Sequence, residues 1–177
     1  MTGSNLWEKS SLAWIKSLGE NGDFGRAHVL DTPMIERVKA LAPANALDVG
    51  CGEGRFCRFM QKLGIKTTGV DPTQSLISEA RRRDSLGDYR LETAENMVIE
   101  PHSFDLVVSY LSFIDISDIA SAIAKMVHAL RPGGALLVAN LNSFNTAAMP
   151  DGWHFDNQAR ARFSIDYYLE ERAIPVA

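Results

Sequence analysis

The chain has 177 residues, of which 46% are hydrophobic and 23% are charged, and its net charge is −4. These values are typical of a globular protein whose single domain has a core of its own. They argue against a nucleic-acid binder that relies on electrostatic attraction, and no apolar stretch approaches the length of a membrane span. We therefore expect one domain over residues 1–177, with a helical N-terminal region (1–45), a core (46–140) and a final loop and helix (141–177).

The cysteines and the first residues indicate a compartment. Cys51 and Cys57 have no second cysteine or histidine pair at zinc-like spacing, so reduced thiols are the simpler interpretation. Residues 1–5 lack the charged and apolar regions of a signal peptide. The sequence therefore predicts a cytoplasmic protein without a metal site.

Two helices are predicted ahead of the core. Apolar residues recur at helical spacing over residues 6–18, where Trp7, Trp14 and Leu18 share one stripe. A turn rich in glycine, asparagine and aspartate follows at residues 19–23, and Pro33 suits the first turn of the next helix.

From Ala46 onward, strand-like and helix-like segments alternate. The predicted strands are 46–50, 65–70, 89–92, 104–109 and 134–140, and the predicted helices are 54–63, 73–84 and 116–130. Such alternation builds parallel strands joined by right-handed helical crossovers. The predicted fold class is therefore α/β, a Rossmann-like doubly wound parallel sheet with helices on both faces.

The most informative segment is the glycine-rich stretch 47–54, Leu-Asp-Val-Gly-Cys-Gly-Glu-Gly. It is typical of a strand that leads through a tight turn into a helix, with glycines where a ligand approaches the backbone. Arg55 stands where a dinucleotide-binding fingerprint has its third glycine. Asp48 would repel a pyrophosphate but attract a ligand that carries an ammonium and a sulfonium. The stretch therefore favours S-adenosylmethionine over NAD.

A second acid agrees with that ligand. The next predicted strand ends in Asp71-Pro72, about 20 residues beyond the first glycine, where nucleotide-binding sheets place a carboxylate on the ribose hydroxyls. With these motifs the chain resembles the class I S-adenosylmethionine-dependent methyltransferases. The resemblance extends from Ala46 to Asn140 and rests on segments in the family's order, namely 47–54, 69–72, 92–95, 104–110 and 130–137.

The resemblance implies that the N-terminal helical region, residues 1–45, folds over the cofactor as a lid, and the alternative is that its aromatic stripe only packs on the core. The resemblance also implies roles for individual residues. Asp48 would orient the methionine amino group, Asp71 would bind the ribose, and Glu95 would accept from the adenine amine. Ser109 and Tyr110 would flank the reactive methyl group. The complete set of cofactor-binding residues that the resemblance implies is Asp48, Gly50, Cys51, Gly52, Asp71, Pro72, Ala94, Glu95 and Ser109.

Methyl transfer from a sulfonium is an in-line displacement, which needs alignment in a dry pocket more than covalent help from the protein. The fourth predicted strand is followed neither by the Asn/Asp-Pro-Pro-Tyr of base-amine methylation nor by the Pro-Cys of cytosine methylation. The resemblance therefore implies transfer to a small-molecule acceptor rather than to nucleic acid or at a membrane. The alternative is a catalytically silent, cofactor-binding homologue that acts as a subunit or a regulator.

The segment from Leu141 to Phe163 shows no clear period, and long loops of this kind are usually functional or mobile. Asn145, Trp153 and His154 are candidates for the acceptor side of the site. A base is required only if the acceptor must lose a proton, and His154 is the candidate for that role beside Tyr110. Residues 165–172 are predicted to form a last helix.

The resemblance implies the strand order 3-2-1-4-5, and family members normally add two further strands beside the fifth. No strand pattern remains for them beyond Asn140, so these last two strands are expected to be missing. The apolar edge at residues 135–140 would then be unpaired, and such edges pair readily with other chains. We therefore expect a homo-oligomer formed through this edge, ahead of coverage of the edge by the chain's own tail.

Overall fold

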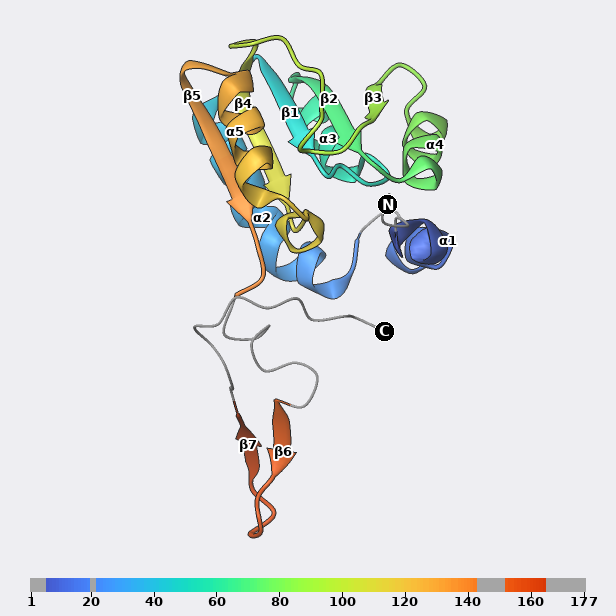
Figure 1. Cartoon of the computed structure of the whole chain (residues 1–177), viewed down its shortest axis with the longest axis vertical. Coiled ribbons are helices and arrows are strands. Elements are labelled where there is room, and N and C mark those ends of the chain that lie inside the picture. The colour runs from blue at the N-terminus through green and yellow to red at the C-terminus, as the bar shows by residue number, and fades with distance from the viewer. Residues whose placement is uncertain (1–5, 20–21, 143–151, 165–177) are drawn as a thin grey trace. The chain divides into compact units, whose positions relative to one another are not determined.

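A computed structural model describes residues 6–19, 22–142 and 152–164 of the chain (Figure 1). The chain divides into two compact units, residues 1–140 and residues 141–177. The first unit contains a parallel sheet and its covering helices, and the described part of the second contains a small hairpin. Each unit is taken by itself below.

The first unit is built on a five-stranded sheet. Its strands are β1 (Asn45–Val49), β2 (Lys66–Asp71), β3 (Asp88–Leu91), β4 (Phe104–Tyr110) and β5 (Leu130–Ala139). All neighbouring pairs are parallel, in the order β3-β2-β1-β4-β5. β4 is buried along its whole length, as a parallel strand covered on both faces should be. The predicted Rossmann-like class and strand order are confirmed.

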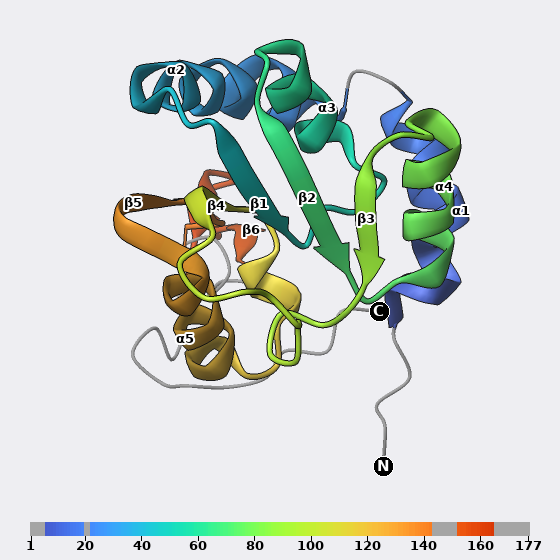
Figure 2. The same ribbon diagram turned by 90° about the horizontal axis from the view of Figure 1, so that it is seen from above.

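Helices cover both faces of this sheet (Figure 2). They are α2 (Asp31–Leu41), α3 (Arg55–Lys62) and α4 (Gln74–Arg83) on one face and α5 (Ile119–Ala129) on the other. The predicted crossover helices are thus confirmed, and their bounds differ from the predicted ones by one to three residues at each end.

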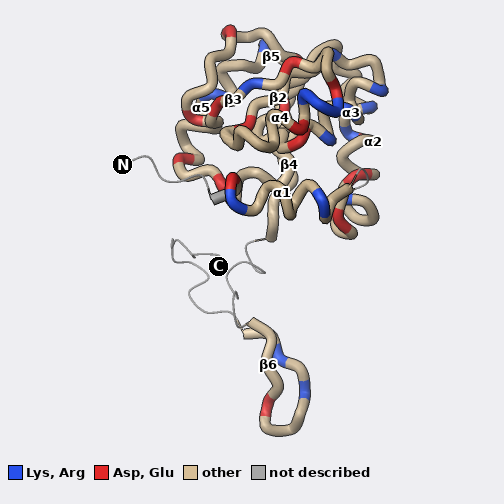
Figure 3. The backbone as a smooth tube through the Cα atoms, turned by 90° about the vertical axis from the view of Figure 1, so that its right-hand side faces the viewer, with Lys and Arg blue, Asp and Glu red and all other residues tan. Residues whose placement is uncertain are grey.

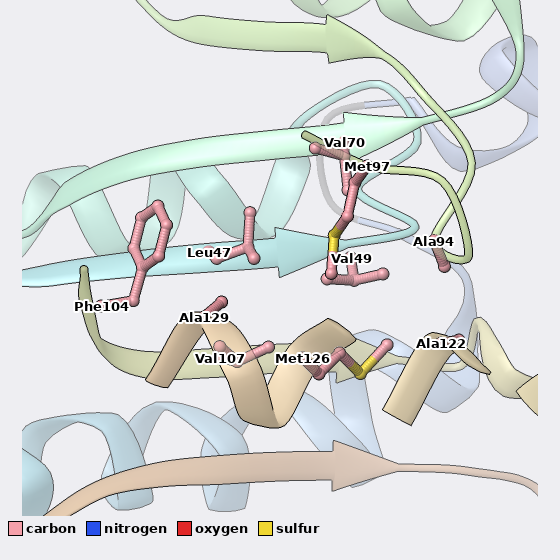
Figure 4. Packing of buried hydrophobic residues seen from close by; sticks show 10 residues of the cluster. All are labelled: Leu47, Val49, Val70, Ala94, Met97, Phe104, Val107, Ala122, Met126 and Ala129. Carbon is pink, nitrogen blue, oxygen red and sulfur yellow. The ribbon is translucent and has the colours of Figure 1, made fainter. Parts of the chain in front are cut away.

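The core lies in two layers, one on each side of the sheet. On one side Leu47 of β1 packs in a cluster with Met126 of α5 (Figure 4). On the other side Ala46 of β1 joins a cluster with Val38 of α2 and Phe56 of α3. Because successive residues of a strand point to opposite faces, β1 is tied to both helical layers and its carboxyl end is fixed in position.

The first helix, α1 (Leu6–Leu18), has the bounds that its apolar stripe predicts. It lies beside α4 (Figure 2), and the fully buried Ser11 shares a hydrogen bond of 2.6 Å with Ser75 there. Arg83 Nη1 of α4 donates to the Gly19 carbonyl at the end of α1, at 3.0 Å. A π-helical segment that the sequence did not predict, η1 (Arg26–Leu30), leads into α2.

The ends of two elements depart from the prediction for identifiable reasons. α5 begins late because the Asp118 side chain caps it, accepting from the Ser121 amide at 3.0 Å. β5 begins early because a register shift lets Phe104 pair with Leu130 before the regular ladder starts. Gly133, at φ 82°, lies within that irregular stretch.

The described part of the second unit is an antiparallel hairpin of β6 (Trp153–Phe155) and β7 (Ala161–Phe163). Its turn is held by Asp156, whose Oδ1 accepts from the Gln158 and Arg160 amides at 2.9 and 3.0 Å. The prediction of a loop without strands is therefore wrong here, since strands this short carry too little period to be recognised. Asn145 and the predicted helix 165–172 lie outside the described residues.

Candidate cofactor site

A cavity of about 470 Å³ lies at the carboxyl edge of the first unit's sheet, beside β1 and β4. The strand order reverses between these two strands, which is where open α/β sheets bind their ligands. The volume falls in the range of about 300–1,000 Å³ that small-molecule sites occupy. The predicted site residues that line it are Asp48, Gly50, Cys51, Gly52, Asp71, Pro72, Ala94, Glu95 and Tyr110.

The glycines of the loop after β1 serve different purposes. A side chain at Gly50, at φ 78°, would place its Cβ 2.3 Å from Ser112 Cβ, so this glycine is required by the protein's own packing. The same holds for Gly54, where a Cβ would stand 2.6 Å from the Tyr89 ring. Gly52, at φ 55°, faces open space. Packing therefore requires glycine at Gly50 and Gly54 whatever the ligand, and Gly50 also lines the cavity. The contacts of Gly50 and Gly52 with a ligand stay predictions.

Asp48 is a buried acid with one oxygen left without a partner. It is 1% exposed, and its Oδ2 accepts from Cys57 Sγ at 3.4 Å. Its Oδ1 has no hydrogen-bond partner among the described residues. Burial raises the pKa of Asp48 to about 7, and the charges of Asp71 and Glu53 add to the shift although the thiol opposes it. An orphaned carboxylate oxygen at a cavity wall calls for a donor from a ligand, and a cationic donor suits it best.

Asp71 ends β2 and holds the glycine loop in place. Its Oδ2 accepts from the Gly52 amide at 3.0 Å, and its Oδ1 accepts from the Thr73 amide at 2.9 Å. Burial raises the pKa of Asp71 above its usual value. An ionised carboxylate has lone pairs for about four hydrogen bonds, so ribose hydroxyls can still bind. The sequence indicated the ribose role but not the support of the loop.

Glu53 is a functional candidate that the sequence analysis missed. It is 3% exposed and lines the cavity. Its Oε2 contacts Arg58 at 2.6 Å and Arg83 at 3.3 Å, while its Oε1 has no hydrogen-bond partner among the described residues. The glycine loop therefore presents a second buried acid to the cavity. The one signal for Glu53 in the sequence was its position between two glycines of the motif.

The segment after β3 forms a further wall. Ala94 is buried there, and the neighbouring Glu95 Oε1 accepts from the Asp118 amide at 3.3 Å. Both residues line the cavity, as the proposed adenine contacts require. The bond to Asp118 ties this wall to the start of α5.

Ser109 does not line the cavity. Its buried Oγ lies 2.6 Å from the Oγ of Ser112, which donates to the Val49 carbonyl at 2.7 Å. Ser112 is the one of the two serines that lines the cavity. Direct contact of Ser109 with a ligand has no support in this placement, because its side chain is fully buried against Ser112. Its hydroxyl instead positions Ser112.

Tyr110 lines the cavity but its hydroxyl is already engaged. It donates to Asp31 Oδ1 at 2.9 Å, and the same carboxylate receives both Nη atoms of Arg55. Burial, followed by the bond to Asp31, raises the pKa of Tyr110 above its usual value. Tyr110 therefore stays neutral at physiological pH and is suited to positioning a ligand rather than to accepting a proton as a tyrosinate.

The lid region contributes aromatic and cationic groups. Trp7 and Trp14 of α1 line the cavity and pack edge to face at 5.2 Å. Arg26 of η1 also lines it, with its guanidinium 5.0 Å from the Trp14 ring and 5.9 Å from the Tyr110 ring. Asp115 also lines the cavity, where burial raises its pKa and the neighbouring Trp7 lowers it. By contrast, Phe24 is 76% exposed and stacks on His28, away from the cavity walls.

His154 is an exposed residue of β6 in the second unit. Its role as a catalytic base, and that of Trp153 on the acceptor side, stay predictions. Within the described ranges, no cluster of His, Cys, Asp and Glu is suited to hold a metal ion. No helix in those ranges combines the length and the apolarity that crossing a membrane requires.

The comparisons with known proteins match the part of the chain that forms the parallel sheet. A family model described as "Methyltransferase domain" matches residues 47–138. The chain is 34% identical over 100 residues to the ubiquinone biosynthesis O-methyltransferase of Mesorhizobium japonicum, covering 54% of this chain and 40% of that protein. It is 30% identical over 132 residues to the malonyl-[acyl-carrier protein] O-methyltransferase of Salmonella typhimurium, covering 74% and 51%. The chain thus spans about half the length of the curated relatives that it matches.

The comparison with solved structures also points to methyltransferases. The fold is similar to an S-adenosylmethionine-dependent methyltransferase from Mesorhizobium loti, with a TM-score of 0.66 and 28% identity over 76% of this chain and 64% of that one. The segment that the family model matches, residues 47–138, makes up more than half of the 177 residues. The chain therefore belongs to the methyltransferase domain family.

Proposed function

We propose that this protein transfers the methyl group of S-adenosylmethionine to a small-molecule acceptor. The observation that carries the proposal is the orphaned Oδ1 of Asp48, buried at the wall of a cavity whose loop leaves open space at Gly52. The ammonium of the cofactor's methionine part supplies the cationic donor that this oxygen lacks. The residues present therefore fit the cofactor.

The charges along the cavity suit the other parts of the cofactor in the same proposal. The methionine carboxylate needs a cation, and the two arginines that line the cavity are Arg26 and Arg55. Asp31 already neutralises Arg55 in a buried pair, whereas the partner of Arg26 is Asp23, which is 40% exposed. Arg26 is therefore the better partner for the carboxylate. Asp71 takes the ribose hydroxyls.

Catalysis in this proposal comes from alignment. The bound cofactor supplies an activated methyl group, and the protein holds it in a cavity walled by Trp14, Leu111 and Ile116, from which water is displaced. Tyr110 positions the acceptor beside these wall residues, and the Tyr110 hydroxyl is itself fixed by its hydrogen bond to Asp31. Any proton that the acceptor must lose would pass to His154 if the acceptor reaches it.

The class of acceptor is inferred from charge and from relatives. The two relatives named above are both O-methyltransferases by name, so a hydroxyl or carboxyl oxygen is the first acceptor atom to test. Basic and acidic positions are interspersed along the backbone of the first unit (Figure 3), and the net charge of −4 does not favour a nucleic acid as the acceptor. We also propose the cytoplasm as the compartment, since both cysteines are free thiols, which suits a reducing environment.

We further propose that the protein self-associates through β5. Within the described residues β5 pairs with β4 alone, so its outer edge is open there. Leu136 and Val138 on this strand are 36% and 38% exposed. Open apolar edges tend to pair with another strand.

The experiment that tests the function has two parts. A calorimetric titration with S-adenosylmethionine and with its demethylated product measures cofactor binding by the wild type and by Asp71→Ala. The variant should lose roughly 2–4 kcal/mol of binding free energy, because ribose hydrogen bonds and support of the loop disappear together. A screen with labelled methyl groups against a metabolite extract then looks for an acceptor. Binding without any labelled product would favour the catalytically silent homologue instead.

A further inference from the structure

Two thiols lie side by side beneath the glycine loop. Cys51 belongs to the loop and lines the cavity, while Cys57 lies on α3 and is fully buried. Both belong to one buried cluster, in which Cys51 Sγ donates to the Gly52 carbonyl at 3.6 Å, and neither forms a disulfide. The glycine at position 69 in β2 leaves room for them, because a Cβ there would stand 2.8 Å from Cys51 Sγ.

The thiol pair is connected to the proposed binding site of the cofactor's ammonium. Cys57 Sγ donates to Asp48 Oδ2 at 3.4 Å, and this is the carboxylate whose other oxygen has no partner. Cys51 stands between Gly50, which packs against Ser112, and Gly52, which faces the open cavity. A change at the two sulfurs therefore acts on both the carboxylate and the loop that border the cofactor.

We propose that Cys51 and Cys57 form a reversible disulfide that lowers the protein's affinity for S-adenosylmethionine. The affinity part rests on the proposed function, in which Asp48 and the glycine loop bind the cofactor. A disulfide needs its sulfurs at about 2.05 Å, well inside the contact distance of two free thiols. Closing that gap draws Cys51 toward α3, shifts the loop at Gly52 and removes the thiol donor from Asp48.

The reaction balances with a hydroperoxide, ROOH, as the oxidant. The Cys51 thiolate attacks the peroxide oxygen and becomes a sulfenic acid, and the departing alkoxide takes up the thiol's proton and leaves as ROH. The Cys57 sulfur then attacks the sulfenyl sulfur. Its proton passes through Asp48 to the departing hydroxide, which leaves as water. Two thiols and one ROOH thus give one disulfide, ROH and water.

Access to the pair depends on the cofactor. Cys51 is 8% exposed and borders the cavity, so a small oxidant reaches it through the cavity when the cofactor is absent. The neighbouring Cys57 lowers the pKa of Cys51, but burial and the charges of Asp48 and Asp71 raise it overall. Attack by the thiolate is therefore slow at neutral pH and faster at higher pH. Bound cofactor fills the route and protects the thiol.

The test uses the full chain, freed of cofactor and treated with hydrogen peroxide. Intact mass under non-reducing conditions should fall by about 2 Da, and peptide mapping should join residues 51 and 57. The demethylated cofactor should then bind at least about tenfold more weakly in a calorimetric titration, and dithiothreitol should restore the affinity. The same cofactor product, added before the peroxide, should slow the loss of mass.

Cys57→Ser is the matched control, since serine keeps a donor for Asp48 but cannot form the bridge. Each protein is compared with its own reduced sample. A wild type that never loses the 2 Da, or that forms the disulfide and binds as before, overturns the proposal. So does a Cys57→Ser variant that loses as much affinity as the wild type, because oxidation of Cys51 alone then explains the effect. If the reduced wild type does not bind at all, the proposed function fails, and the mass measurement still decides whether the disulfide forms.

Discussion

At the scale of a single residue, the buried carboxylate of Asp48 suits the cofactor's ammonium but lowers the stability of the folded protein. Its pKa is about 7 in the folded protein, against a usual value of 3.8, chiefly because it is buried. Between about pH 4 and pH 7 the folded state therefore binds more protons than the unfolded state. The free energy of unfolding falls as pH rises through this window, by up to about 4 kcal/mol for a shift of this size.

The stability of Asp48→Asn tests this directly. The variant should melt at a higher temperature than the cofactor-free wild type at pH 8, because no buried charge forms, and the gain should vanish near pH 4. Asp88→Asn is the control, since Asp88 is a surface acid that pairs with Arg90 at 2.8 Å and does not line the cavity. An Asp48→Asn variant that is less stable at pH 8 would contradict the account of the buried charge.

The affinity for the cofactor should also depend on the ionisation of Asp48. The ammonium needs the carboxylate form, so affinity should fall by nearly tenfold per unit below about pH 6.5. Calorimetric titrations between pH 5.5 and pH 8.5 measure this profile, at about half-unit steps. The profile of Asp48→Asn should be weaker throughout and lack that slope. A wild-type profile that is flat across the range would remove Asp48 from the proposed contact.

The sequence identified the acids of the site better than the purpose of its glycines. Asp48 and Asp71 could be predicted because their positions in a strand–turn–helix motif fix where they lie. The need for Gly50 and Gly54 could not, since it comes from Ser112 and Tyr89, which approach from distant parts of the chain. Such contacts exist only once the sheet has formed.

At the scale of the elements, Asp31 joins three of them. It begins α2, bonds Arg55 at the start of α3 and accepts from Tyr110 at the end of β4. Asp31 is 7% exposed and Arg55 is 8% exposed. Removing one partner of a buried pair leaves the other charge uncompensated, which is strongly destabilising.

Asp31→Ala should therefore lower the free energy of unfolding by about 3–5 kcal/mol. Urea denaturation followed by circular dichroism measures the change. Glu36→Ala is the control, because Glu36 is an exposed residue of the same helix. A loss no larger than that of Glu36→Ala would mean that the buried network adds nothing to stability.

The helices and strands of the core could be predicted because burial sets the spacing of their apolar residues. β4, for example, is buried along its whole length. The role of Arg83 could not. Basic residues in the last turn of a helix usually face solvent, but Arg83 contacts Glu53 and the Gly19 carbonyl, so it links α4 to the glycine loop and to α1. The hairpin of β6 and β7 was also missed, since short exposed strands leave no clear pattern.

At the scale of the whole molecule, the side of β5 that no described strand covers leads to a prediction about assembly. Light scattering at micromolar concentration should detect self-association, and Val138→Lys should reduce it because a charge on an edge strand opposes pairing. Val98→Lys is the control, since Val98 is 78% exposed and lies outside β5. A clean 19.5 kDa monomer with a cooperative melt would contradict the prediction.

The most direct test of the central claim is a calorimetric titration of the reduced protein with S-adenosylmethionine at pH 8, beside the same titration of Asp48→Asn and a titration with NAD. The account predicts one site per chain for S-adenosylmethionine, no measurable binding of NAD, and a loss of roughly 2–4 kcal/mol in the variant, which cannot offer a carboxylate to the ammonium. Equal affinity in the wild type and Asp48→Asn, or binding of NAD in place of S-adenosylmethionine, would contradict it.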